Sequence, residues 1–214
     1  MRYTTYLFDF DGTLVDSMPT YVAVMLRILD EAGISYGSDI IKIITPLGYL
    51  GTAKYYIEQL GLDMPAEEIV SRMKRYAYEE YAHRIDAKPH VIEVLRALKA
   101  RGADLHVLTA SPHDVLDVCL KRLGIYELFT NVWSCDDFAT TKADPAIYRM
   151  AAERIGRPVE EILFLDDNYN ADRTAVMAGM RVCGVYDMSS EEYTEEIKSV
   201  AHHYVYDFSE LLTD

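Results

Sequence analysis

The stretch YLFDFDGTLVDS, residues 6–17, decides the fold. It begins as an apolar run and then places Asp9 and Asp11 two residues apart, followed at once by a Gly-Thr pair. In an extended strand, residues i and i+2 face the same side, so we expect the two carboxylates to converge, with Phe10 on the other face. Ligands of open parallel sheets gather at the carboxyl ends of the strands. A single aspartate here would most simply cap the next helix, but a converging pair favours a functional site.

The composition narrows the class of protein. The chain has 214 residues, half of them hydrophobic, which suits one large domain or a core domain with a smaller insertion. The net charge of −14 argues against nonspecific binding to nucleic acid or to an anionic membrane, because both require a basic face. We therefore expect a small-molecule partner, no nucleic acid and no membrane; the sequence does not predict the oligomeric state.

Other features of the sequence concern the compartment. The three cysteines lack C-x-x-C spacing, and an odd number of them is typical of a protein from a reducing cytosol. The N-terminus enters a predicted strand at once, so we expect no targeting segment before it. No apolar stretch is long enough to cross a bilayer. Together these features predict a cytoplasmic protein.

Short apolar runs alternate with helical patterns along most of the chain. Two of the helical patterns end at a glycine that is typical of a helix stop, Gly102 and Gly124. Such alternation with apolar strands predicts an α/β fold, a Rossmann-like parallel sheet covered by helices on both faces. The predicted strands are residues 4–8, 104–108, 132–134, 162–165, 181–185 and 204–206.

One interval breaks this alternation. Between Asp16 and about Lys88 the pattern is only helical. We expect a core made of residues 1–16 and 88–214, with residues 17–87 forming an inserted α-helical cap domain over the carboxyl edge of the sheet. The alternative is a set of extra helices on the flank of the sheet. We favour the cap because the insertion begins directly after the paired carboxylates.

A second apolar strand also ends in carboxylates. The segment ILFLDDNYNAD places Asp166 and Asp167 at the end of such a run. If this strand neighbours the first one, three or four carboxylates share a small space, and like charges raise one another's pKa unless a cation neutralises them. Hard oxygen ligands select Mg²⁺, which commonly binds a substrate phosphate as well. The alternative is a partly solvated rim of aspartates at helix N-termini.

The acids of this segment are not equivalent. Strand alternation predicts that Asp166 faces away from Asp9 and Asp167 unless the turn begins early. Asp172 falls in the first turn of the next helix, where a carboxylate is often only a favourable partner for the helix dipole. We therefore expect Asp167 to matter most for metal binding, Asp166 less and Asp172 least.

Near two more predicted strand ends lie groups that could bind an anion, which complements the acidic pairs. In LHVLTASPHD, Thr109 ends a strand and Ser111 opens a helix, and hydroxyl and backbone N–H groups at a helix N-terminus bind anions well. The alternative is an ordinary helix cap. Lys142 lies just before another helix in FATTKADPAIY. It is either a solvated surface charge or, near an acidic metal site, a group that neutralises a phosphate.

These motifs together resemble those of the haloacid dehalogenase-like hydrolases. DFDGTLVDS is similar to the first motif of that superfamily residue by residue, LTAS to its hydroxyl motif, KADPAIY to its lysine motif and LDDN to its acidic motif. The resemblance covers essentially the whole chain. It points to the phosphoglycolate phosphatase-like branch, in which a helical cap follows the first motif.

The resemblance implies roles for individual residues. Asp9 would be the nucleophile that forms an aspartyl-phosphate, and Asp11 the general acid–base, with its backbone carbonyl on Mg²⁺. Asp167 would bind the metal directly, with Asp166 close by or acting through water. The implied catalytic residues are Asp9, Asp11, Thr109 and Lys142, the phosphate-binding residues are Phe10, Asp11, Thr109, Ala110 and Lys142, and the metal ligands are Asp9, Asp11, Asp166 and Asp167.

The chain departs from the family pattern in the later motifs. Ala143 follows the lysine where the family commonly has proline, and Asp166 stands where it often has glycine. A later acid at a fixed offset is also usual, but Ala171 occupies that place and Asp172 follows one step on. Which residue completes the outer shell of the metal is therefore open.

The leading function is a Mg²⁺-dependent phosphatase that hydrolyses a small soluble phosphomonoester through an aspartyl-phosphate. The first alternative is a sugar phosphomutase of the same superfamily, and a less favoured one is a non-catalytic binding module on this fold. The module is disfavoured because Asp9, Asp11 and Lys142 are all present. A dehalogenase is disfavoured because it needs no acid–base at Asp11. The sequence does not predict which ester is the substrate.

Overall fold

The computed structural model describes residues 3–213 and divides the chain into two compact units. One unit, here called the sheet unit, comprises Met1–Asp16 and Ile85–Asp214. The other, the helical unit, comprises Ser17–Arg84. The helical unit is thus an insertion that begins one residue after Asp16, within the first motif.

The sheet unit is built on a parallel sheet, six-stranded over residues 3–213, with the order β3-β2-β1-β4-β5-β6. The two chain segments that carry paired aspartates are adjacent, because β1 lies between β2 and β4. Each of the predicted strands is present, and the predicted α/β Rossmann-like architecture is confirmed. The strands are β1 Thr5–Phe8, β2 Asp104–Thr109, β3 Asn131–Ser134, β4 Ile162–Asp166, β5 Arg181–Val185 and β6 His203–Val205.

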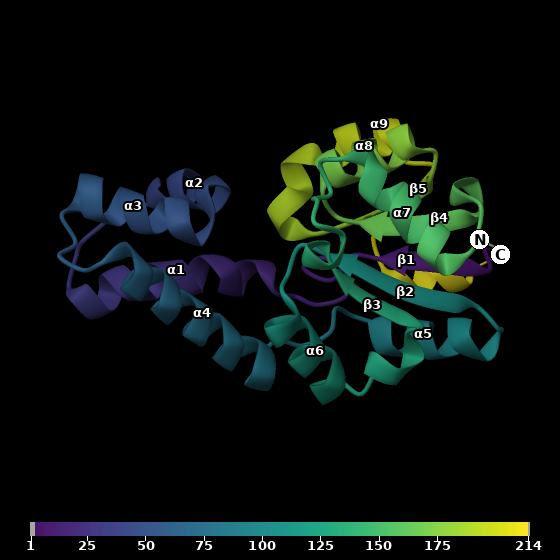
Figure 1. Ribbon diagram of the computed structural model, residues 1–214, viewed down its shortest axis with the longest axis horizontal. Coiled ribbons are helices and arrows are strands. Elements are labelled where there is room, and N and C mark those ends of the chain that lie inside the picture. The colour runs from purple at the N-terminus through teal and green to yellow at the C-terminus, as the bar shows by residue number, and fades with distance from the viewer. Residues whose placement is uncertain (1–2, 214) are drawn as a thin grey trace. The chain divides into compact units, whose positions relative to one another are not determined.

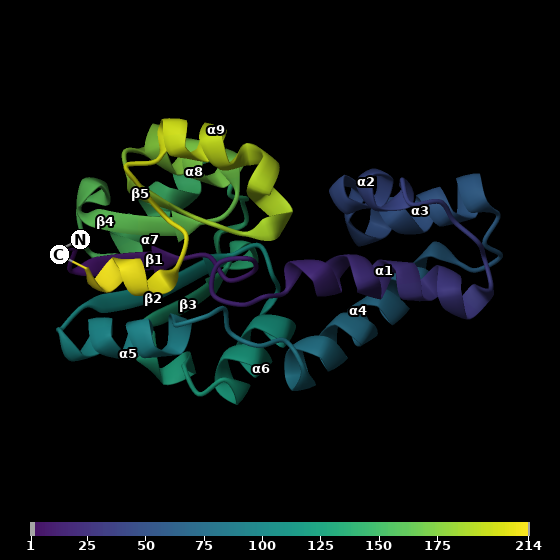
Figure 2. The same cartoon turned by 180° about the vertical axis from the view of Figure 1, so that it is seen from behind.

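Helices cover both faces of this sheet (Figure 1; from behind, Figure 2). On one face lie α5 (Val91–Ala100) and α6 (His113–Arg122), and on the other α7 (Pro145–Ile155), α8 (Tyr169–Ala178) and α9 (Thr194–Val200). Short 3-10 helices complete the unit: η2 Tyr126–Leu128, η3 Cys135–Phe138, η4 Val159–Glu161, η5 Met188–Tyr193 and η6 Phe208–Leu212.

The central strands are buried on both faces, which explains why they are continuous apolar runs rather than alternating ones. Leu7 and Phe8 of β1 and Phe164 of β4 have no exposed surface. Burying side chains of this size stabilises the fold by roughly 1.5–3 kcal/mol each. The carboxyl ends of β1 and β4 are therefore rigid. The polar residues that directly follow these strands are fixed in position as a result.

The helical unit contains α1 (Met18–Ala32), α2 (Ile40–Ile44), η1 (Thr45–Leu47), α3 (Gly48–Leu60) and α4 (Ala66–His83). Helix α4 packs against both α1 and α3. Met25, Tyr56 and Met73 are buried between them, and the Tyr56 hydroxyl donates to the Met25 carbonyl at 3.1 Å. The role of this unit as a cap stays a prediction.

The two segments that join the units pair with each other inside the sheet unit. The Asp16 amide donates to the Asp86 carbonyl and the Lys88 amide to the Leu14 carbonyl, both at 3.0 Å. Val15 forms an antiparallel bridge with Ala87 between these bonds. The chain that returns from the helical unit therefore runs directly beside the segment that follows Asp9 and Asp11.

The structure describes two features that concern the predictions on membranes and cysteines. No helix within residues 3–213 combines the length and the apolar character needed to cross a bilayer. Cys119, Cys135 and Cys183 are buried free thiols.

Candidate active site

Asp9 directly follows β1 and lies beside the end of β4. Phe8 pairs with Val107 of β2 and with Leu165 of β4, and the Asp9 amide continues the ladder by donating to the Leu165 carbonyl at 2.8 Å. The sheet therefore brings Asp9 beside Asp166, the residue after Leu165, although the two are far apart in sequence.

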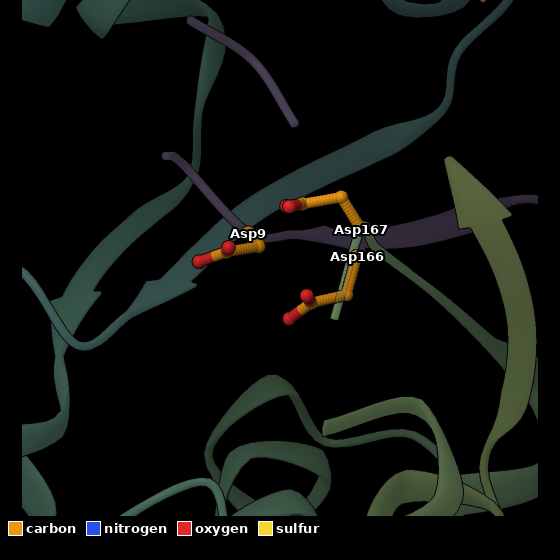
Figure 3. A group of neighbouring side chains, drawn as sticks. All are labelled: Asp9, Asp166 and Asp167. Carbon is orange, nitrogen blue, oxygen red and sulfur yellow. The ribbon is translucent and has the colours of Figure 1, made fainter. Parts of the chain in front are cut away.

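Three carboxylates meet at this edge of the sheet. Oxygen atoms of Asp9, Asp166 and Asp167 lie within 4.8 Å of one another, and all three residues are buried. Figure 3 shows their carboxyl groups projecting into the same space. The predicted convergence of two acidic strand ends is what places them there.

The carboxyl group of Asp166 lies with those of Asp9 and Asp167, which strand alternation allowed only for a turn that begins early. Strand β4 ends at Asp166 itself, and the Asn168 amide donates to Asp166 Oδ1 at 2.8 Å. A turn therefore begins directly after the strand, and its hydrogen bond holds the Asp166 carboxyl group. Asp166 and Asp167 leave the backbone on different sides but direct their carboxyl groups the same way (Figure 3).

Lys142 connects the carboxylates. Its Nζ lies 2.5 Å from Asp9 Oδ1 and 2.8 Å from Asp166 Oδ2, and only 13% of the side chain is exposed. Burial alone would lower the pKa of Lys142, but the neighbouring carboxylates outweigh it and hold the pKa well above its usual value. Lys142 is therefore a buried cation, not a solvated surface charge.

The loop that carries Lys142 is held in place by Tyr148. The Tyr148 hydroxyl, on α7, lies within hydrogen-bond distance of the Lys142 carbonyl at 3.2 Å and of the Ala171 carbonyl on α8 at 3.1 Å. Tyr148 is fully buried and packs edge-on against Phe164 of β4. These contacts tie the lysine loop to the strand that leads into the acidic motif and to the helix that follows it.

The donor set fits a hard divalent cation. The cluster has three carboxyl groups but one ammonium group, Lys142, which contacts two of them, so acidic groups are in excess in a buried place. Burial raises the pKa of Asp9 to about 7 although Lys142 opposes this, and burial together with Asp166 and Asp9 raises the pKa of Asp167 well above its ordinary value. A cation among these oxygens would favour the ionised carboxylates and so lower these pKa values.

The Gly-Thr pair after Asp11 contacts Asp167, and this accounts for the residue types at both positions. The Thr13 hydroxyl donates to Asp167 Oδ1 at 3.0 Å. Gly12 adopts φ +73°, and a Cβ at this position would lie 2.5 Å from Asp167 Oδ2. Any side chain at Gly12 would therefore collide with the carboxylate, and the backbone there would be strained as well.

Asp11 is held by the loop after β2. The Ser111 hydroxyl donates to Asp11 Oδ2 at 2.5 Å, and the Ser111 amide donates to Thr109 Oγ1 at 3.0 Å. Thr109 is buried, whereas Ala110 is exposed. The side chain of Phe10 is fully buried, so only its backbone could contact an anion. The structure therefore joins the hydroxyl motif to the first motif through Ser111.

Comparison with known protein families matches residues 3–179 to the haloacid dehalogenase-like hydrolases. This chain belongs to that family. The resemblance inferred from the four motifs is confirmed, and the acidic cluster, Lys142 and Thr109 lie within the matched residues.

The relatives of this chain include phosphatases and a pyrophosphatase. The chain is 30% identical to pyrophosphatase PpaX of Bacillus velezensis over 186 residues, which covers 86% of this chain and 83% of that protein. It is 29% identical to phosphoglycolate phosphatase of Escherichia coli over 201 residues, which covers 83% and 79%. The family and these relatives identify the chain as an enzyme, a phosphoric monoester hydrolase.

Solved structures share the fold over nearly the whole chain. A putative β-phosphoglucomutase from Thermotoga maritima superposes with a TM-score of 0.84 at 23% identity, covering 97% of this chain and 96% of the other. CbbY from Rhodobacter sphaeroides, in complex with phosphate, gives 0.80 at 21% identity, covering 98% and 96%. At these identities the likeness establishes the fold, not the substrate.

Asp172 differs from what its sequence position suggests. It lies in the first turn of α8, as predicted, but Asn168 caps that helix by accepting from the amides of Asn170 and Ala171. Asp172 is fully buried, and neither carboxylate oxygen has a hydrogen-bond partner among the described residues. Burial and the nearby Asp166 raise its pKa well above the ordinary value. It is a buried carboxyl group near the acidic cluster rather than a solvated first-turn acid.

Sequence reasoning missed two further residues at this edge. Lys88 Nζ lies 2.7 Å from the Gly12 carbonyl and 2.8 Å from Asp187 Oδ2, and both side chains are largely buried. Neither residue belongs to a motif, and Asp187 is 99 positions from Lys88, so no spacing in the sequence signals the pair. Ser111 was noted only as a helix start, although its place in LTAS is a usable signal.

Proposed function

We propose that this hydrolase is a cytoplasmic, Mg²⁺-dependent phosphatase that hydrolyses a small phosphomonoester through an aspartyl-phosphate formed on Asp9. The observation that carries the proposal is the bridge of Lys142 between Asp9 and Asp166 within a buried acidic cluster. The buried cysteines, which lack C-x-x-C spacing, suit a reducing compartment.

Asp9, Asp166 and Asp167 would hold the cation, with the backbone carbonyl of Asp11 as a further ligand. Their carboxylate oxygens are hard ligands in a small space, which is the chemistry that Mg²⁺ prefers. When bound, Mg²⁺ offsets the negative charge of the phosphoryl group and so permits an anion to approach it. Thr13 holds Asp167 in place for this role.

Asp9 supplies the nucleophile. One of its carboxylate oxygens forms a bond to phosphorus as the bond from phosphorus to the leaving alkoxide breaks, which leaves an acyl phosphate on Asp9. Lys142, in contact with Asp9 and charged, reduces the repulsion between the carboxylate and the incoming phosphate. Together with the Thr109 hydroxyl and the backbone amides near Phe10 and Ala110, it would hold the phosphoryl oxygens.

Asp11 moves the protons. In its acid form it gives a proton to the departing alkoxide, which leaves as an alcohol. The resulting carboxylate then takes a proton from the water that attacks the acyl phosphate, so Asp9 and Asp11 return to their starting states as inorganic phosphate leaves. Ser111, which donates to Asp11 Oδ2, orients this carboxyl group.

A panel of phosphate esters, assayed with Mg²⁺ and with EDTA, tests the proposal. We expect turnover of at least one small phosphomonoester with Mg²⁺, its loss with EDTA, and its loss in Asp9→Asn, whose amide is a far poorer nucleophile. Near-normal turnover by Asp9→Asn would contradict the covalent mechanism. Transfer of the phosphoryl group between positions of a sugar phosphate, with little release of inorganic phosphate, would favour the phosphomutase instead.

A further inference from the structure

Lys88 is a buried lysine outside the acidic cluster. Its Nζ lies 2.7 Å from the Gly12 carbonyl, 2.6 Å from the Tyr186 carbonyl and 2.8 Å from Asp187 Oδ2. An ammonium group has three hydrogens to donate, so these acceptors can use its full capacity. A lysine so fully matched is fixed in place, whereas exposed lysines retain their rotamer freedom.

The acceptors come from two separate segments of the sheet unit. Gly12 belongs to the turn that follows Asp9 and Asp11, and Tyr186 and Asp187 belong to the loop after β5. Lys88 itself pairs through its backbone amide with the Leu14 carbonyl. A single side chain therefore connects the turn of the first motif to the loop after β5. Strand β4, which leads into the acidic motif, lies between β1 and β5 in the sheet.

Asp187 holds the lysine in its orientation. The Ser189 amide and hydroxyl donate to Asp187 Oδ1 at 2.9 and 2.6 Å, and leave Oδ2 for Lys88. Burial would raise the pKa of Asp187, but the hydrogen bonds from Lys88 and Ser189 outweigh it and lower the pKa. Asp187 is therefore ionised, and the charge of Lys88 is balanced locally rather than by the acidic cluster.

Gly12 is the point at which this arrangement reaches the cluster. The space that a Cβ of Gly12 would need is occupied by the carboxyl group of Asp167, and Thr13 donates to the same carboxylate. The Gly12 carbonyl points to Lys88 while the other side of the residue packs on Asp167. A displacement of this turn would therefore move Asp167 or leave a gap beside it.

We infer that Lys88 is a positioning residue, whose ammonium holds the Gly12 carbonyl and so sets the place of Asp167, which makes it a determinant of divalent-cation affinity although it does not touch the cation. The inference rests on the proposed function insofar as that function assigns a cation to Asp167. Residues that orient metal ligands typically change metal affinity by about 10–100-fold when they are removed.

The competing account is that Lys88 and Asp187 form a structural ion pair and nothing more. The two accounts differ in what they predict for the two partners. Asp187→Asn removes the charge of one partner but keeps a side-chain oxygen that accepts from Lys88, so the ammonium stays on the Gly12 carbonyl. Lys88→Met removes the contact with Gly12. A purely structural pair would make the two variants equivalent, because each leaves one buried charge without its partner.

The test is a titration of the full-length, substrate-free protein with Mn²⁺, followed by calorimetry or by the electron paramagnetic resonance of the free ion. Wild type, Lys88→Met, Asp187→Asn and the double variant are compared, with the exposed Lys198→Met as the matched lysine control. We expect Lys88→Met to raise the Kd for Mn²⁺ by about tenfold or more, and Asp187→Asn and Lys198→Met to change it by less than about threefold.

Thermal unfolding of the same proteins separates stability from positioning. Both single variants are expected to unfold at lower temperature than wild type. The double variant, which has no unpaired buried charge, should regain part of the Tm lost in Lys88→Met without regaining its Mn²⁺ affinity. Equal Kd changes in the two single variants, an unchanged Kd in Lys88→Met, or recovery of affinity in the double variant would overturn the inference.

The wild-type measurements distinguish this inference from the proposed function. A wild-type protein that binds Mn²⁺ but hydrolyses no phosphate ester would contradict the proposed function, while the comparison of variants would still decide the role of Lys88. A wild-type protein that binds no Mn²⁺ would contradict both. Hydrolysis with normal Mn²⁺ affinity in Lys88→Met would overturn the inference alone.

Discussion

Two loops of the sheet unit each place a buried lysine at the carboxyl edge of the sheet. Lys142, before α7, and Lys88, before α5, have almost equal exposure, 13% and 14% of the side chain. Their partners differ. Lys142 contacts two carboxylates of the cluster, whereas Lys88 contacts one carboxylate outside it and two backbone carbonyls. Burial alone thus does not define the role of a lysine; its acceptors do.

The difference assigns the two lysines to separate tasks. Lys142 offsets charge where the phosphoryl group is expected, so no other cation in the site replaces it fully. Lys88 holds backbone, so an excess of the divalent cation can compensate for its loss by mass action.

Lys142→Met should have the largest effect. We expect kcat to fall by about 10²–10³-fold or more, as when a group that stabilises developing charge is removed, and the loss should persist at saturating Mg²⁺. The unfolding free energy of the metal-free protein should fall by about 3–5 kcal/mol, because two buried carboxylates lose their cation. Steady-state kinetics across a Mg²⁺ series and chemical denaturation provide the measurements.

Lys88→Met should differ from Lys142→Met in its dependence on Mg²⁺. We expect turnover to fall by about tenfold at a Mg²⁺ concentration well below the wild-type half-saturation point, and to recover most of the loss at saturation. The same kinetic series measures both variants. If the loss in Lys88→Met persisted at saturation as it does in Lys142→Met, the two lysines would not have the separate tasks proposed here.

Ser111→Ala should have an intermediate effect that depends on the leaving group. Without the hydroxyl, Asp11 loses the hydrogen bond that orients it, and we expect about a tenfold loss of kcat/KM for an alkyl phosphate, a fraction of what a general acid contributes. An aryl phosphate with a good leaving group needs less protonation and should lose less. Equal losses for the two substrates, with phosphorylation rate-limiting in both, would argue against this role of Ser111.

Asp172→Asn should have the smallest effect on catalysis and a distinct effect on stability. The folded-state pKa of Asp172 is raised, so the folded protein retains a proton that the unfolded chain releases near the ordinary value of 3.8. The unfolding free energy of metal-free wild type therefore falls as pH rises from about 4 toward the folded-state pKa. The asparagine lacks this dependence.

The Tm difference between Asp172→Asn and wild type should be near zero at about pH 4 and grow in favour of the variant at higher pH, to about 2–4 °C for each kcal/mol gained. Differential scanning calorimetry in EDTA at several pH values measures it. A variant that is less stable than wild type at neutral pH would show that the carboxylate is stabilised by a contact that the unpaired oxygens do not reveal.

The parts of this account that were predictable from the sequence depend on local pattern. The apolar runs before Asp9 and Asp166 predicted the strands. The convergence of Asp9 with Asp11, expected from the period of two, stays a prediction. That the two acidic strand ends would meet needed only the rule that parallel strands present their carboxyl ends at one edge. Lys142 was predictable as a candidate because it precedes a helix in a matching motif.

The other features of the site depend on tertiary contacts, which no local sequence pattern encodes. Asp166 turns toward Asp9 because the strand ends at that residue, a boundary that apolar periodicity does not fix. Asp172 is buried because it lies on the face of α8 that packs against β4 and β5, although acids in a first turn are commonly exposed. Lys88 and Asp187 meet only through the tertiary fold.

The central claim is that Asp9 carries the phosphoryl group during turnover. Asp11→Asn, in which loss of the acyl phosphate to water is slowed, should be mixed with an activated aryl phosphate and Mg²⁺ and quenched in acid within a few turnover times. Mass spectrometry of the digested protein should then find one phosphoryl group, labile to hydroxylamine, on the peptide that contains Asp9. A phosphoryl group on another residue, or turnover with no phosphorylated protein in Asp11→Asn or wild type, would contradict the account.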